Sequence, residues 1–170
     1  FLARGIEGLV VRITAKGATE ADAWATVDTE EKELRAILGD LVFGVDDETM
    51  EFAVLDRLRT RGWSLGVAES VTGGFIGARI VNVPGASEVF RGTIGAYATD
   101  VTRAVLGVTD EVVVSEEAAR EMAEGAQRVL DADVGIAVTG VAGPTEQDGI
   151  AVGTILLLAR LEHGASFAVG

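Results

Sequence analysis

Apolar and polar positions along the second part of this chain predict strands and helices in alternation. Continuous apolar runs predict strands at 63–68, 92–97, 134–139 and 153–161. Helical spacing of apolar residues predicts helices at 73–82, for about two turns from 99, and from the cap Ser115 to Leu130. This alternation is typical of a layered α/β domain with a largely buried sheet.

The first part of the chain has a different pattern. The β-branched run at 8–14 predicts a strand, and residues 41–43 predict a second, short one. Asp28, followed by glutamates, has the pattern of a capping box that opens a helix, and Gly39 is expected to end that helix.

An acidic run at 46–48 marks the expected boundary between these two parts. A helix with apolar residues at helical spacing is expected after it, from about 48 to 61. We therefore predict a small α+β unit at 1–45, followed by an α/β domain at 46–170.

Composition and charge limit the function classes. The chain is 48% apolar and 24% charged, which is typical of a globular protein. Its formal charge of −13 repels phosphates, so we expect no direct nucleic-acid binding. No apolar run approaches the roughly 20 residues that span a bilayer. With no pattern of a signal peptide either, we expect a cytoplasmic protein without membrane contact. Because it starts at Phe1 and stops directly after an apolar run, we expect part of a longer protein.

The residue types also limit the chemistry. The absence of cysteine excludes disulfides, thiol catalysis and cysteine-ligated metal. The single histidine, His163, cannot form a His-rich metal site and is expected at the surface. We therefore expect neither a metal nor a cofactor.

The turn after the strand at 63–68 carries the most informative residues. Ser70 follows this strand, and Thr72, Gly73 and Gly74 precede a helical pattern. The first N–H groups of a helix have no partner within it and carry partial positive charge. The turn could therefore present a nucleophilic hydroxyl beside a cradle for a phosphate or an oxyanion. The alternative is that Ser70 only caps the helix, with glycines that allow close packing.

A second glycine-rich loop follows the third expected strand of the domain. It contains Thr139, Gly140, Ala142 and Gly143. Ligands in α/β sheets usually bind at the carboxyl ends of strands, so we expect this loop and Ser70 to face one pocket. The alternative is a plain turn.

Two further side chains near these loops are candidates for the chemistry. Tyr97 ends the strand at 92–97 and could orient a substrate or donate a hydrogen bond; otherwise it is a half-buried aromatic of that strand. Glu69 could act as an acid or base beside Ser70, or it is an exposed carboxylate without a role.

These motifs resemble the C-terminal domain of the competence/damage-inducible protein CinA family. The family's E-S-C-T-G-G motif is matched by E-S-V-T-G-G at 69–74, and its T-G-x-A-G-P loop by residues 139–144. Shorter family motifs recur in the same order at 83–87, 91–97, 122–125 and 152–154. The likeness covers about 48–170, and residues 1–45 resemble the small connector that precedes this domain.

The resemblance implies a three-layer α/β/α fold and hydrolysis of the carboxamide of nicotinamide mononucleotide, which releases ammonia. In that chemistry Ser70 would attack the amide carbon, and Tyr97 and Glu69 are our other catalytic candidates. The nucleotide would contact the loops at 72–74 and 139–143. We expect a homo-oligomer that binds this small-molecule nucleotide.

One departure from the family pattern concerns the base. Active members carry a lysine after the tyrosine, thought to take the serine proton, and Thr102 stands in its place. Neither threonine nor the neighbouring Arg103 accepts a proton near neutral pH. The chain's two lysines both lie within 1–45. Asp100, Glu69 or a lysine from another chain are the remaining candidates.

A second departure concerns charge near the glycine loop. Ile150 replaces a family lysine, while Glu146 and Asp148 add negative charge. Losing a cation and gaining acids weakens a phosphate site. The chain is therefore either an amidohydrolase of impaired activity or a catalytically inactive nucleotide-binding or dimerisation module.

Overall fold

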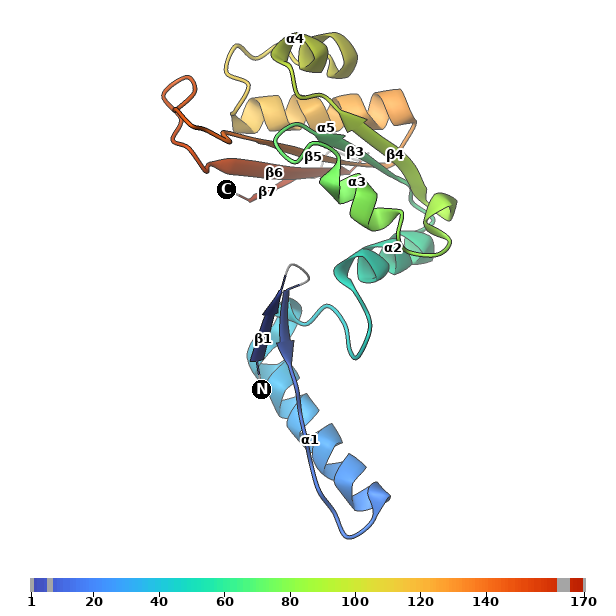
Figure 1. The fold of residues 1–170 in the computed structure, drawn as a ribbon. Coiled ribbons are helices and arrows are strands. Elements are labelled where there is room, and N and C mark those ends of the chain that lie inside the picture. Colours follow the sequence, from blue (N-terminus) through green and yellow to red (C-terminus); the bar gives the residue numbers. More distant parts are fainter. Residues whose placement is uncertain (1, 6–7, 162–165, 170) are drawn as a thin grey trace. The chain divides into compact units, whose positions relative to one another are not determined.

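The computed structural model describes residues 2–5, 8–161 and 166–169, so His163 lies outside the described residues (Figure 1). Internal contacts divide the chain into two compact units, Phe1–Ala53 and Val54–Gly170. The expected boundary near residue 45 falls within the first of these units. None of the helices in the described residues is both long and apolar enough to cross a membrane.

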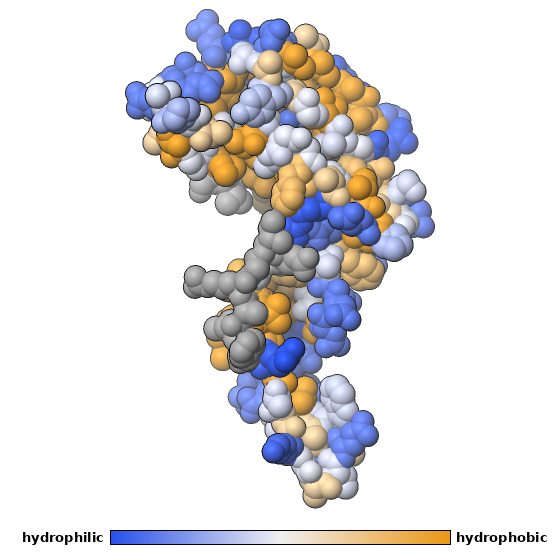
Figure 2. Space-filling view, viewed as in Figure 1, coloured by the Kyte–Doolittle hydropathy of each residue, from blue (hydrophilic) through white to orange (hydrophobic). Residues whose placement is uncertain are grey.

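The first unit consists of a hairpin and a long helix. Strands β1 (Leu2–Gly5) and β2 (Gly8–Val11) pair antiparallel, and are followed by α1 (Glu20–Leu38) and the 3-10 turn η1 (Gly39–Leu41). No side chain among residues 8–53 is buried. Apolar side chains lie between charged ones on the molecular surface (Figure 2). This unit therefore has no buried core of its own among the side chains described.

Two predictions for this unit were wrong. Helix α1 begins at Glu20 instead of Asp28, because Thr19 and Asp22 form a capping box upstream. The Thr19 N–H donates to Asp22 Oδ2 at 3.0 Å, and the Asp22 N–H donates to Thr19 Oγ1 at 3.2 Å. The strand expected at 41–43 is absent, since the chain turns there and the Val42 N–H donates to the Gly39 carbonyl.

The remaining elements alternate as the pattern predicted. In chain order they are α2 (Met50–Arg61), β3 (Leu65–Glu69), α3 (Phe75–Ile80), η2 (Ala86–Glu88), β4 (Phe90–Gly95), α4 (Thr99–Val101), the π-helical η3 (Thr102–Leu106), α5 (Glu116–Leu130), β5 (Val134–Gly140), β6 (Ile155–Leu161) and β7 (Ser166–Val169). The capping role of Ser115 is confirmed, because the Ala118 N–H donates to its hydroxyl at 2.9 Å. Strand β7 was not predicted.

The second unit is a mixed sheet between two helical layers, which confirms the predicted α/β fold (Figure 1). The strand order is β4-β3-β5-β6-β7; β4, β3 and β5 run parallel, while β6 and β7 pair antiparallel. Helix α5 packs on one face of the sheet through alanines and Met122. Helices α2 and α3 pack on the other face, against residues such as Leu65 and Val67.

Close contacts of α5 with the sheet and with η3 depend on glycine. A Cβ atom on Gly135 of β5 would lie 2.2 Å from the Ala123 carbonyl oxygen, and one on Gly125 of α5 would lie 2.3 Å from the Leu106 oxygen. Both positions exclude any side chain. This packing fixes α5, and with it Met122, against the carboxyl ends of the parallel strands.

Candidate functional site

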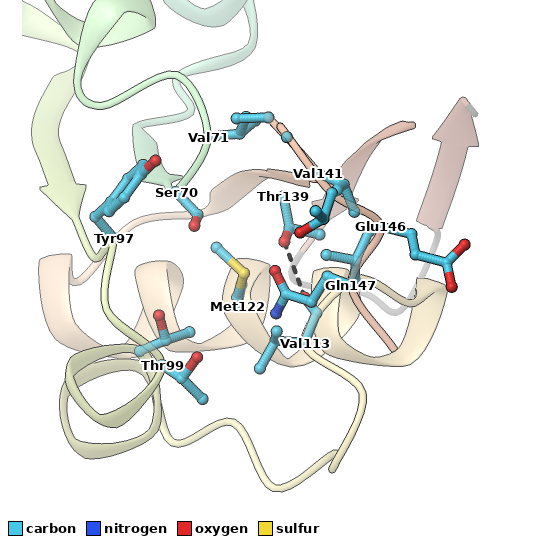
Figure 3. Close-up of a pocket in the computed structure, with 16 residues that line it drawn as sticks. Ser70, Val71, Tyr97, Thr99, Val113, Met122, Thr139, Val141, Glu146 and Gln147 are labelled. Carbon is cyan, nitrogen blue, oxygen red and sulfur yellow. Dashed lines mark hydrogen bonds between the residues drawn. The ribbon is translucent and has the colours of Figure 1, made fainter. Parts of the chain in front are cut away.

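A cavity of about 300 Å³ lies where the parallel strands β3, β4 and β5 end (Figure 3). Its described lining comes from the segments after these strands, from η3 and α5, and from the loop between β5 and β6. Ser70 and Gly140 both line it, so the two loops meet at one cavity as the sequence predicted. Thr139, Ala142, Gly143 and Tyr97 also line it.

Topology explains why the cavity forms here. After β3 the chain runs through α3 to β4 on one side, and then through α5 to β5 on the other side. The segments that leave the neighbouring strands β3 and β4 therefore diverge, since α3 packs on one face of the sheet and α5 on the other. Such a switch point opens a crevice at the carboxyl edge.

Ser70 is held at this edge by its backbone. Its N–H donates to the Val138 carbonyl at 3.0 Å, and its own carbonyl accepts from the Gly73 N–H at 3.0 Å. The hydroxyl is directed towards the cavity (Figure 3). Helix α3 has Gly74 as its N-cap residue, so the alternative that Ser70 caps this helix is wrong.

Glu69 is fully buried and is turned away from the cavity lining. Its carboxylate accepts three backbone hydrogen bonds, from Gly74 at 3.1 Å, Ile76 at 3.0 Å and Gly77 at 2.8 Å. The Thr93 hydroxyl donates a fourth at 3.0 Å. The alternative of an exposed carboxylate is therefore wrong. Because these donors already surround both oxygens, the geometry does not favour proton exchange with Ser70.

Opposing effects set the pKa of Glu69. Burial alone raises the pKa of the carboxyl, since it disfavours the charge. The N–H groups of Gly77 and Ile76 and the Thr93 hydroxyl outweigh this, so the pKa lies below its usual value. The Thr72 hydroxyl adds to the lowering, although it is buried without a well-aligned hydrogen bond. Glu69 is thus an anion at neutral pH, held at the start of α3.

The chain itself supplies acceptors for the backbone donors at the start of α3. Each N–H from residue 73 to residue 77 has an acceptor: Ser70 O for Gly73, Thr72 O for Phe75, and the Glu69 carboxylate for Gly74, Ile76 and Gly77. Thr72, Gly73 and Gly74 are also not part of the described cavity lining. The Glu69 carboxylate and the Ser70 carbonyl thus take the N–H groups of Gly74 and Gly73, and the anion cradle at 72–74 stays a prediction.

Tyr97 follows the end of β4 and is 71% exposed, so the alternative of a half-buried strand aromatic is wrong. Its ring stands beside Ser70 at the cavity (Figure 3). Thr99, which the sequence analysis did not select, lines the same side.

Thr102, at the position of the family lysine, lines the cavity and is buried. Its hydroxyl is the donor to two backbone carbonyls, that of Ala96 at 2.9 Å and that of Ala98 at 3.1 Å. The Arg103 guanidinium contacts the carbonyls of Asp110 and Glu111. Asp100 is exposed and lies outside the described lining.

The second loop is held against β6. Thr139 is buried and its hydroxyl donates to the Val113 carbonyl at 2.9 Å, which joins β5 to the segment before α5. A Cβ atom on Gly140 would lie 2.6 Å from the Thr154 carbonyl oxygen, so this close approach requires glycine. Ala142 and Gly143 are exposed at the cavity.

A small hairpin places one further polar side chain at the cavity. Gln147 and Ile150 exchange backbone hydrogen bonds at 2.8 and 3.2 Å around Asp148 and Gly149, which both have positive φ. Two such residues are typical of the tight turn that the D-G dipeptide favours, so the sequence contained this signal. In Figure 3 the Gln147 amide points into the cavity, while the Glu146 carboxylate points away from Ser70.

The family assignment follows from comparison with known proteins. The model of the CinA C-terminal domain matches residues 47–169, which include every element of the second unit from β3 to β7. The chain belongs to the CinA family. The resemblance predicted from the motifs is thereby confirmed. Among the described residues of this CinA domain, no group of three or more acidic, His or Cys side chains is placed to hold a metal ion.

Relatives and solved structures agree with this assignment. A CinA-like protein of Synechococcus sp. (strain RCC307) is 45% identical over 139 residues, which cover 79% of this chain and 33% of the relative. A CinA-like protein of Frankia casuarinae is 43% identical over 160 residues, which cover 91% of this chain and 37% of the relative. The chain thus spans about a third of the length of the curated relatives it matches.

The crystal structure of the competence/damage inducible protein CihA from Agrobacterium tumefaciens is similar, with a TM-score of 0.65 at 30% identity. The similarity covers 70% of this chain and 76% of that one. A CinA superfamily protein from Escherichia coli has a TM-score of 0.66 at 27% identity, over 78% of this chain and 83% of that one.

Proposed function

We propose that this CinA C-terminal domain binds a nicotinamide nucleotide at the Ser70 cavity and hydrolyses its carboxamide slowly. The observation that carries the proposal is the position of Ser70. Its hydroxyl lies at the carboxyl end of β3, the middle one of the three parallel strands, is directed into the cavity and is not used as a helix cap. A serine that caps no helix and lies in a crevice at a switch point of the sheet is a candidate nucleophile.

The chemistry would proceed through an ester. Ser70 Oγ attacks the carboxamide carbon, the C–N bond breaks, and ammonia leaves with the serine proton. Water then cleaves the ester, which restores the hydroxyl and gives the nicotinate product. Tyr97 and Thr99 line the cavity near Ser70 and would position the ring.

The slow rate follows from the surroundings of Ser70. Among the described lining residues the ionisable ones are Tyr97 and Glu146, and the Glu146 carboxylate points away from Ser70 (Figure 3). Thr102 uses its hydroxyl on backbone carbonyls. The serine proton would therefore reach the leaving nitrogen through water instead of a positioned base, and such a base is typically worth about 10²–10⁴ in rate.

A second candidate is a nucleotide-binding or dimerisation module without catalysis. Thr102 is the observation that favours it, because this side chain fills the place of the base and is tied to the Ala96 carbonyl. The two candidates share the cavity and differ only in turnover.

Ammonia release from nicotinamide mononucleotide by the purified protein separates these candidates, with Ser70→Ala as the control. Turnover that Ser70→Ala abolishes would support the hydrolase. Binding without turnover would support the module, and turnover that survives in Ser70→Ala would reject Ser70 as the nucleophile.

A further inference from the structure

The polar groups in the interior of the cavity are neutral. They include the hydroxyls of Ser70, Thr99, Thr102 and Thr139 and the side-chain amide of Gln147. The one formally charged side chain in the described lining is Glu146, whose carboxylate points outward (Figure 3). Lysine and arginine do not occur in that lining. A phosphate would therefore enter a cavity that holds no side-chain cation among the residues described.

The residue before Ser70 in the chain carries a buried negative charge. The buried Glu69 carboxylate occupies the start of α3 and takes the N–H groups of Gly74, Ile76 and Gly77. These are the donors that would otherwise attract an anion. Because the carboxylate occupies these donors, they are not offered to a phosphate in the cavity.

Other lining groups suit a cation that carries a carboxamide. Tyr97 exposes 71% of its surface beside Ser70, and the face of an aromatic ring attracts a pyridinium cation. The Gln147 amide holds a donor and an acceptor, which pair with the oxygen and nitrogen of a carboxamide. A carboxylate offers acceptors alone and would satisfy only half of this pair.

We infer that the cavity prefers the nicotinamide nucleoside, a pyridinium cation with a ribose and no phosphate, over the phosphorylated nucleotide. This inference rests on the proposed function and names the substrate form for that site. The positive ring meets Tyr97, the carboxamide reaches Ser70 and Gln147, and the ribose end needs no cationic partner.

Isothermal titration calorimetry of the purified chain with nicotinamide riboside and with nicotinamide mononucleotide tests the inference. The nucleoside is expected to bind at least about fivefold more tightly, since the phosphate brings one or two negative charges to a cavity whose described lining offers no side-chain cation. Equal or tighter binding of the mononucleotide would overturn the inference and leave the proposed function standing. Binding of neither compound would remove the proposed function itself.

Two substitutions that each raise the net charge by one test what sets the preference for the nucleoside. Gln147→Lys places a cation in the cavity, and Glu146→Gln removes an anion whose carboxylate points outward. Gln147→Lys is expected to shift the ratio of the two Kd values towards the mononucleotide by about tenfold, and Glu146→Gln by less than about threefold. An unchanged ratio in Gln147→Lys would show that missing positive charge does not set the preference.

A matched pair at position 97 tests the ring. Tyr97→Phe keeps the aromatic face and is expected to retain nucleoside binding, while Tyr97→Leu is expected to weaken it by about three- to tenfold. Equal losses in both variants would overturn the role of the ring face, because the hydroxyl would then be the determinant.

Discussion

The carboxylate of Glu69 accepts a hydrogen bond of 2.8 Å from the backbone N–H of Gly77, eight residues further along the chain. With Gly74 and Ile76 as additional donors, one side chain satisfies much of the first turn of α3. The turn that carries Ser70 lies between these partners. Its shape therefore depends on a residue that does not line the cavity.

Glu69→Gln is expected to lower the free energy of unfolding by about 2–4 kcal/mol, because a buried N–H donor then faces the donors of α3. Urea denaturation followed by circular dichroism measures this change. Glu88→Gln is the matched control: Glu88 is exposed and pairs with Arg59 on the surface, where such pairs are worth about 0–1 kcal/mol. Equal losses in both variants would contradict the capping role.

The stability that Glu69 contributes is expected to depend on pH. Its pKa is lower in the folded state than in the unfolded chain, so the contribution is fully present above the unfolded value of about 4.3. It is lost as the pH falls through the folded pKa. Urea denaturation between pH 7 and pH 3 is expected to show the gap between wild type and Glu69→Gln narrowing below about pH 4. A constant gap would argue against an ionised Glu69.

Thr102→Lys is expected to raise ammonia release from a nicotinamide substrate by about 10- to 1000-fold, because an amine beside Ser70 supplies the missing base. The new side chain also removes hydrogen bonds to Ala96 and Ala98, so stability should fall by about 1 kcal/mol. Thr102→Met has similar length and no amine. If the two variants have the same rate, the base is not the main defect.

Gly135→Ala is expected to destabilise the domain by about 2–4 kcal/mol, since the new Cβ would lie 2.2 Å from the Ala123 carbonyl and push α5 away. Gly95→Ala is the control, because no atom lies within 4 Å of its added Cβ. Thermal unfolding of both variants checks the contrast. A similar decrease in Tm for both would mean that α5 can shift at little cost.

The parts of this structure that the sequence predicted depend on local patterns. Ser115 was predicted as a cap because a serine directly before an apolar helical pattern is a local signal, and the bond from the Ala118 N–H confirms it. The cavity loops were identified because glycine-rich turns follow apolar strands. The hairpin at Asp148 was not predicted, although its D-G dipeptide is typical of such a turn, and the presence of Gln147 at the cavity depends on the fold.

The parts that were missed depend on distant contacts. Glu69 accepts a hydrogen bond from Thr93 of a neighbouring strand. Every residue of β3 is buried, so no alternation of exposed and buried positions indicates to which face the Glu69 side chain points. The hydroxyl of Thr102 is bound to the end of β4, and the close approach at Gly135 involves a helix that comes before it in the chain. Sequence spacing alone carries none of these relationships.

Because Glu69 stabilises the turn, the stability of the pocket and its chemical reactivity depend on different side chains. The residue that maintains the turn and the residue that would perform the reaction are adjacent in the chain, yet they serve different physical needs. A substitution at Ser70 or at position 102 can therefore silence the chemistry while the architecture persists. Such a domain can change its function during evolution, from catalyst to sensor or adaptor, while its fold is retained.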